Sequence, residues 1–129
     1  MTYKLNISLE DNLATMTVKG TCSIIDMKAL VNILLQDALY IPTLNLFIDK
    51  REVKYTPVVS EVLDISQFIT QHKQHFRGKI AIIMDSELFH IMFKLSSQYT
   101  SKHGLNSNVF HNPNEALAWI AEPDTIKVH

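Results

Sequence analysis

The stretch Gly78-Lys79-Ile80-Ala81-Ile82-Ile83-Met84-Asp85 decides the fold of this 129-residue chain. Every residue between Lys79 and Asp85 is apolar, and a short unbroken apolar run predicts a strand covered on both faces. The run from Leu44 to Ile48 has nearly the same character. Fully covered strands are typical of parallel sheets, whose strands are joined by helical crossovers. We therefore expect helices between these strands.

The residues before these two runs predict a β-hairpin and a first helix. Residues 3–9 alternate between apolar and polar side chains, which is the period of a half-buried strand. Residues 10–12 form a turn and residues 13–18 a second strand, so the chain opens with a hairpin. Ser23 stands three residues before Asp26, and this capping-box pattern predicts a helix that continues to the Ile41-Pro42 break.

The second half of the chain predicts three more helices and one further strand. Thr56-Pro57 suits the cap and first position of the second helix. Its core face consists of Val58, Val62, Ile65, Ile69 and Phe76. Ser86 (or Asp85 before it) caps a third helix, which Gly104 is suited to end. Residues 105–110 are the last strand, and Asn112, followed by proline, opens a short fourth helix.

The order of these elements is β-β-α-β-α-β-α-β-α, which predicts an α/β fold. Strands separated by helices require right-handed crossovers and a mainly parallel sheet with helices packed on it. We expect a mixed, mostly parallel five-stranded sheet with an N-terminal β-hairpin and about four helices. A single domain is expected over residues 1–121, with a C-terminal tail at residues 122–129.

Three local signatures occur along the chain in a fixed order. The first is Phe47-Ile48-Asp49-Lys50-Arg51, an apolar strand that ends in Asp-x-Arg. The second is the apolar strand at residues 78–83, and the third is Val109-Phe110 followed by Glu-Ala-Leu-Ala-Trp-Ile at residues 115–120. In this order and spacing the chain resembles the SpoIIAA-like (STAS/SEC14) family. The resemblance implies a STAS-type fold, related to the SEC14 (CRAL-TRIO) lipid-binding fold.

The resemblance also raises the question of a phosphorylation switch. Bacterial anti-sigma factor antagonists with a related fold exchange partners through a phosphorylated serine in an Asp-Ser-x-Gly motif. The aligned stretch here is Asp49-Lys50-Arg51-Glu52, which has neither the serine nor the glycine. We therefore expect no phosphorylation site, and assign the nearby hydroxyls of Thr56 and Ser60 to helix capping or a solvated turn.

Composition argues against several classes of function. With 12 basic and 13 acidic residues the net charge is −1, so we expect no nucleic-acid partner. The single cysteine allows no internal disulfide, which suits a reducing compartment. The first six residues lack the pattern of a signal peptide, and no apolar run approaches the roughly 20 residues of a membrane-spanning helix. We expect a cytoplasmic protein, either free or peripheral to a membrane.

No catalytic or metal-binding pattern emerges from the sequence. His72 and His75 could be neighbours at a helix end, but a zinc site needs three or four ligands and no cysteine is near. Cys22 could be activated at a helix N-terminus, although a small packed residue explains it better. Three glycines cannot compose a phosphate-binding or dinucleotide-binding loop. We expect no metal, no cofactor and no enzyme activity.

The third helix carries more apolar side chains than one sheet requires. Its core stripe is expected to consist of Leu88, Ile91, Met92, Leu95 and Tyr99. Phe89 and Phe93 fall on the flank of that stripe, and Val59 and Leu63 widen the apolar face of the second helix in the same way. This surplus has three interpretations: helix-on-helix packing, an interface with a partner or a second copy, and a cleft for an apolar ligand.

Two hypotheses of function follow. The first is a non-catalytic binding or regulatory module that contacts a protein partner, a second copy or a membrane surface. Its apolar contact would consist of Val59, Leu63, Phe89 and Phe93, and its polar rim of Asp49, Arg51 and Lys54. The second is a carrier or sensor of an apolar small molecule or lipid, held in a SEC14-like cleft between the second and third helices.

Two carboxylates support a site at one edge of the sheet. Asp49 and Asp85 each follow an apolar run, and ligands of open α/β sheets bind beyond the carboxyl ends of strands. Parallel strands would place both carboxylates at the same edge. Capping of the following turn is the alternative role, and it is common for aspartate.

Overall fold

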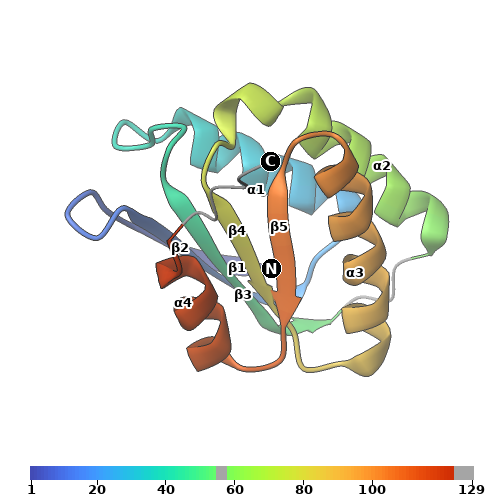
Figure 1. Ribbon diagram of the computed structural model, residues 1–129. Coiled ribbons are helices and arrows are strands. Elements are labelled where there is room, and N and C mark those ends of the chain that lie inside the picture. The colour runs from blue at the N-terminus through green and yellow to red at the C-terminus, as the bar shows by residue number, and fades with distance from the viewer. Residues whose placement is uncertain (55–57, 124–129) are drawn as a thin grey trace, which may run out of the picture.

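The computed structural model describes residues 1–54 and 58–123 and contains one sheet in the order β1-β2-β3-β4-β5 (Figure 1). The strands are β1 (Thr2–Ser8), β2 (Leu13–Thr21), β3 (Asn45–Lys54), β4 (Lys79–Ile83) and β5 (Asn106–Phe110). β1 and β2 pair antiparallel, and all other neighbours pair parallel. The helices are α1 (Ile24–Gln36), α2 (Val59–Gln71), α3 (Glu87–Lys102) and α4 (Pro113–Ala121), with a 3-10 turn η1 (Lys73–His75). The predicted α/β fold, with its N-terminal hairpin and mostly parallel sheet, is confirmed.

Local capping explains where the helices begin and end. Ser23 and Asp26 form a reciprocal capping box at the start of α1, each side chain accepting a hydrogen bond from the other's backbone N–H. Gly104, with φ of +93°, takes the left-handed conformation after α3. The Asn112 side chain accepts a 2.7 Å hydrogen bond from the backbone of the second residue of α4. The expected cap at Thr56-Pro57 lies outside the described residues.

The alternation of side chains along the strands divides the core into two layers. α1, α2 and α3 cover one face of the sheet, where even-numbered residues of β3 and β4 such as Leu46 and Ile80 are buried. α4 lies in front of the opposite face in Figure 1 and packs against odd-numbered residues such as Phe47 and Ile83. Neighbouring residues of one strand therefore serve opposite faces of the molecule.

A buried lysine anchors α4 to the second face. Lys79 is only 8% exposed. Its Nζ donates hydrogen bonds to the carbonyl oxygens of Trp119 (2.9 Å) and Glu122 (2.5 Å). The same Nζ lies 5.5 Å from the Trp119 ring centroid. Carbonyl oxygens at a helix C-terminus carry partial negative charge, so this ammonium is well compensated.

The strand β3 is longer than the sequence indicated. It was expected to end at Asp49 but continues to Lys54, because the polar residues beyond Asp49 still pair with β2 across a register shift after Thr17. An exposed ion pair between Lys19 and Glu52 (3.1 Å) joins the two strands there. Asp49 is thus inside the strand, whereas Asp85 follows the end of β4.

The buried face of α3 also differs from the expected one. Leu88, Ile91 and Leu95 were expected in the core but are 48%, 57% and 47% exposed. The buried residues of this helix are Phe93, Ser96, Ser97 and Thr100. Ser96 and Thr100 can be buried because their hydroxyl groups find hydrogen-bond partners, such as the 2.6 Å contact between Ser96 and Ser66 of α2. The same error placed Val58 in the core, although it is 55% exposed.

Candidate functional site

An apolar cavity of about 80 Å3 lies between the sheet and the helices α1, α2 and α3. Its lining consists of Met16, Val18, Met27, Leu30, Val31, Leu34, Leu46, Ile48, Lys50, Ile65, Ile69, Phe76, Ile80, Ile82, Phe93 and Ser96. The lining follows β3 over four residue steps, from Leu46 to Lys50, a length of about 13 Å. The lining residues therefore extend along the central strands, and most of them are apolar.

The cavity lies nearer α1 than the sequence hypothesis assumed. α2 and α3 are in direct contact through Ser66 and Ser96, whose hydroxyl oxygens are 2.6 Å apart. α1 contributes four lining residues and α2 contributes Ile65 and Ile69. α3 contributes Phe93 and Ser96, so the space is bounded by all three helices above the sheet, with α1 providing the largest share of the helical lining.

An ion pair spans α1 and α2. Lys28 of α1 donates hydrogen bonds of 3.0 and 3.1 Å to the carboxylate of Asp64 of α2, and its Nζ lies 5.5 Å from the Phe68 ring centroid. The pair is partly exposed, so its contribution to stability is small, about 0.5 kcal/mol. Its geometry makes it a contact that must open if the two helices separate.

Lys50 brings a charge to the cavity. Lys50 is two residues beyond Ile48 on the same face of β3, and both residues line the cavity. Its Nζ lies 4.7 Å from the centroid of the buried Phe93 ring. Burial lowers the pKa of Lys50 to about 8, and the residue keeps limited contact with solvent. At pH 7 the amine is therefore still mainly an ammonium.

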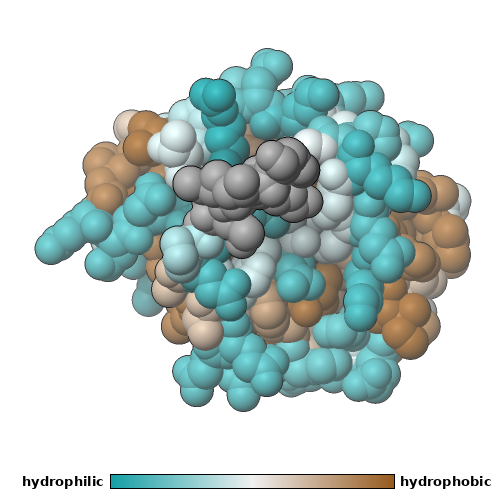
Figure 2. All heavy atoms as spheres, in the orientation of Figure 1, coloured by the Kyte–Doolittle hydropathy of each residue, from teal (hydrophilic) through white to brown (hydrophobic). Residues whose placement is uncertain are grey.

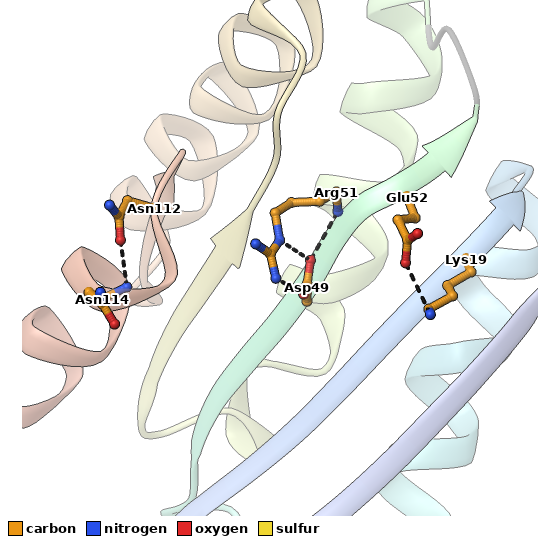
Figure 3. A network of polar contacts seen from close by, with 6 residues as sticks. All are labelled: Lys19, Asp49, Arg51, Glu52, Asn112 and Asn114. Carbon is orange, nitrogen blue, oxygen red and sulfur yellow. Dashed lines mark hydrogen bonds and ion pairs between the residues drawn. The ribbon is translucent and has the colours of Figure 1, made fainter.

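Asp49 and Arg51 form a self-contained pair on the opposite face of the sheet (Figure 3). Arg51 Nη2 lies 2.7 Å and Nε 3.0 Å from the Asp49 carboxylate, which also accepts the Arg51 backbone N–H. This arginine lowers the pKa of Asp49. Because Asp49 is on the α4 side and Lys50 on the helix side, the structure does not bring the expected polar rim to the apolar residues of α2 and α3.

The expected apolar contact set is divided between the core and the surface. Phe93 is 4% exposed and packs in the core, and Phe89 is only partly exposed, so neither can serve as an open contact. Val59 and Leu63 are exposed on α2, as expected. Lys54 is exposed at the end of β3.

Exposed aliphatic residues gather instead on the outer surface of α2 and α3. Figure 2 shows hydrophobic atoms at the right-hand edge, where Figure 1 places these helices. We call this set the outer helix face; its members are Val59, Leu63, Leu88, Ile91 and Leu95. The Ser66–Ser96 contact places the two helices side by side, so the members from both helices form one surface.

The structure supports no nucleophile or metal site among the described residues. Burial raises the pKa of the Cys22 thiol, which is 0% exposed, so the thiol stays neutral and inaccessible. No three histidine, cysteine, aspartate or glutamate side chains converge within residues 1–54 and 58–123. In the same residues no helix has the length and hydrophobicity to cross a membrane.

A histidine pair lies beyond the ends of β4 and β5. The rings of His90 and His111 stack with centroids 3.9 Å apart and an interplanar angle of 11°. His111 Nε2 is 3.5 Å from a carboxylate oxygen of Glu87, and its Nδ1 is 3.1 Å from the carbonyl oxygen of Met84. Partial burial and the adjacent His111 lower the pKa of His90.

The comparisons with known proteins agree with this architecture. The SpoIIAA-like family matches residues 13–121, and the chain therefore belongs to the SpoIIAA-like family. The crystal structure of an uncharacterized protein of the DUF3478 family with a SpoIIAA-like fold, from Shewanella loihica, superposes with a TM-score of 0.60. The two sequences are 19% identical, and the match covers 93% of each chain. No curated protein matches the chain in sequence.

Lys50 is the functional candidate that the sequence reasoning missed. It stands in the Asp-x-Arg signature, between Asp49 and Arg51, which were selected as candidates because they follow an apolar strand. The alternation of side chains along the strand could have identified Lys50. Leu46 and Ile48 face the apolar layer, and the next even-numbered residue is expected on the same side. A lysine at this position places a positive charge on the side of the strand that faces the core.

Proposed function

We propose that this protein is a non-catalytic binding protein that takes up a small apolar molecule in the cavity below α1 and α2. The observation that carries the proposal is the cavity of about 80 Å3 with an almost wholly apolar lining. Apolar cavities in folded domains accept apolar ligands; a cavity of about 150 Å3 accepts benzene, so this smaller space must widen to hold a chain of six carbons. The proposal assigns the protein the role of a carrier or sensor.

The arrangement of the helices supports uptake of a ligand. α1 and α2 are joined over the cavity by the exposed Lys28–Asp64 pair, which is a weak contact. α2 and α3 are held more firmly, since the Ser66–Ser96 hydrogen bond between them is buried. We therefore infer that a ligand enters by separation of α1 from α2, with α2 and α3 moving together.

Titration with 1-hexanol, observed by NMR, tests the proposal. Burying five methylene groups at about 0.8 kcal/mol each corresponds to a Kd of about 1 mM. Leu30→Phe places additional volume in the lining and should weaken hexanol binding at least about tenfold, because the added ring occupies the ligand's space. Ile33→Phe, on the same helix but outside the lining, is the matched control and should bind as the wild type does.

Two results would contradict the proposal. One is a wild-type protein that shows no saturable shifts up to about 20 mM hexanol, well above the Kd derived from the buried methylene groups. The other is equal binding by the Leu30→Phe and Ile33→Phe proteins, which would place the alcohol elsewhere on the molecule.

The outer helix face favours self-association as a second candidate function. Val59, Leu63, Leu88, Ile91 and Leu95 are each more than 40% exposed, and contiguous apolar surface marks interaction sites. An apolar face can pack against its own copy without charge repulsion, as two-fold symmetric dimers do. Sedimentation equilibrium should show a dimer that Ile91→Asp converts to monomer, whereas Ile25→Asp, at an 80% exposed position on α1, leaves it intact. A monomeric wild type at about 100 μM would remove this candidate, because a stable interface of standard size binds more tightly than that.

A further inference from the structure

We propose that the ligand of the cavity is a small carboxylic acid with an aliphatic chain, and that the ammonium group of Lys50 binds its carboxylate. This inference rests on the proposed function, because it names the chemical class of the molecule that the cavity takes up. It is carried by the position and surroundings of Lys50 rather than by the volume of the cavity.

The Lys50 ammonium has no counter-ion among the residues that the structure describes. Its Nζ lies 4.7 Å from the Phe93 ring centroid, and within residues 1–54 and 58–123 no hydrogen bond or ion pair involves that nitrogen. The ionisable group that interacts with it is Cys22, whose thiol is held neutral by burial. A cation withdrawn from water without a partner costs free energy, and a bound anion recovers it.

Comparison with Lys79 separates a structural lysine from a binding lysine. Both residues lie on adjacent strands and extend into the protein, and both ammonium groups lie near an aromatic ring. Lys79 donates to two carbonyl oxygens at the end of α4, so its hydrogen-bonding capacity is used. The three donors of the Lys50 ammonium are not used in this way, and they remain open to an acceptor that the described residues do not supply.

The shape of the cavity determines where the two parts of the ligand lie. Lys50 is at one end of the lining, toward the carboxyl end of β3, and Leu46 and Phe76 lie toward the other. The N-termini of α1 and α3 are at the Lys50 end as well, since both helices follow the carboxyl ends of their strands, and their dipoles favour an anion there. A carboxylate at Lys50 would direct its chain along β3 over the apolar residues.

The test compares hexanoate with 1-hexanol, which have chains of equal length and differ in the carboxylate. A hydrogen bond to a charged group is expected to increase affinity about ten- to hundredfold. Wild-type protein at pH 7 should therefore bind hexanoate at least about tenfold more tightly than hexanol, and saturation with hexanoate should raise the pKa of Lys50, followed by the NMR shift of its ε-carbon. Lys50→Met should lose the preference for hexanoate, because the carboxylate then has no ammonium group to bind.

The outcomes distinguish this inference from the proposed function. If hexanol binds in the cavity but wild-type protein shows no preference for hexanoate, the carboxylate inference is overturned and the cavity proposal stands. If neither molecule binds, the proposed function itself is refuted. Lys54→Met, at an exposed position of the same strand, is the control for loss of one positive charge and should retain the preference. The wild-type comparison decides the question even if the Lys50→Met protein fails to fold.

Discussion

Replacement of Lys50 by methionine is expected to stabilise the ligand-free protein at pH 7, although it removes the contact of the ammonium group with the Phe93 ring. Burial lowers the pKa of Lys50 from 10.5 to about 8, which corresponds to about 3 kcal/mol of destabilisation of the charged form. Because the residue keeps some contact with solvent, we reduce this to about 2 kcal/mol. The methionine variant also loses the favourable contact between the ammonium and the Phe93 ring, which reduces its expected gain in stability by about 1 kcal/mol. The expected gain is about 1 kcal/mol, or roughly 4 °C in Tm.

The pH dependence of this gain identifies its cause. Below pH 8 the amine is charged in both the folded and the unfolded chain, so the wild type carries the full cost of burial. Between pH 8 and 10.5 the folded protein loses the proton that the unfolded chain still holds, and the stability of the wild type rises. The advantage of the Lys50→Met protein over the wild type should therefore disappear by about pH 10.5.

Urea unfolding followed by circular dichroism at pH 7 and pH 10.5 measures both effects. Lys54→Met is the control and should change stability by less than about 0.5 kcal/mol at either pH, because its side chain is exposed. The reasoning would be refuted by a Lys50→Met protein that is less stable than the wild type at pH 7. It would equally be refuted by a difference that stays the same at both pH values.

Three further predictions concern packing and titration elsewhere in the domain. Phe93→Ala should lower the free energy of unfolding by about 3–5 kcal/mol and Leu95→Ala by less than about 0.5 kcal/mol, because only Phe93 is buried. Equal losses in urea unfolding would contradict the observed buried face of α3. Gly78→Ala should lower Tm by several degrees, because a Cβ there would collide with the carbonyl oxygen of Leu44, and an unchanged Tm would show that the backbone yields. The lowered pKa of His90 means that the unfolded chain takes up the proton first, so stability should fall as pH drops from 7 through 6.5 and below. His90→Gln should weaken that dependence in thermal unfolding at pH 5 to 7, and an identical pH profile would exclude His90 as its source.

The family signatures have different physical explanations in the structure. The Trp119 of the closing helix packs against Phe110, and its carbonyl oxygen accepts a hydrogen bond from Lys79, so that signature fixes α4 on the sheet. The apolar strand at residues 79–83 is covered on both faces, as its composition predicted. The Asp-x-Arg signature combines two roles, because Asp49 and Arg51 satisfy each other on the α4 side while Lys50 between them reaches the cavity.

The sequence by itself determined the order of the elements, the parallel sheet, the opening hairpin and the family. These follow from local information: unbroken apolar runs, alternation, and caps such as Ser23 and Asn112, which act within a few residues. Hydrophobic periodicity could not assign the buried face of α3, because Ser96 and Thr100 are buried through hydrogen bonds to α2 and β5. Ser96 and its partner Ser66 are 30 residues apart, and Thr100 and Ser107 belong to different elements, so the apolar pattern of α3 itself contains no sign of these contacts.

Only the tertiary structure decided which charged side chains are compensated. In the sequence Lys50 and Lys79 are equivalent, each a basic residue in or beside an apolar strand. The fold brings the end of α4 to Lys79 and an apolar cavity to Lys50, so the Lys79 ammonium is hydrogen-bonded to carbonyl oxygens, whereas the Lys50 ammonium has no hydrogen-bond acceptor among the described residues. That difference arises from contacts between segments about 40 residues apart, and no local pattern encodes it.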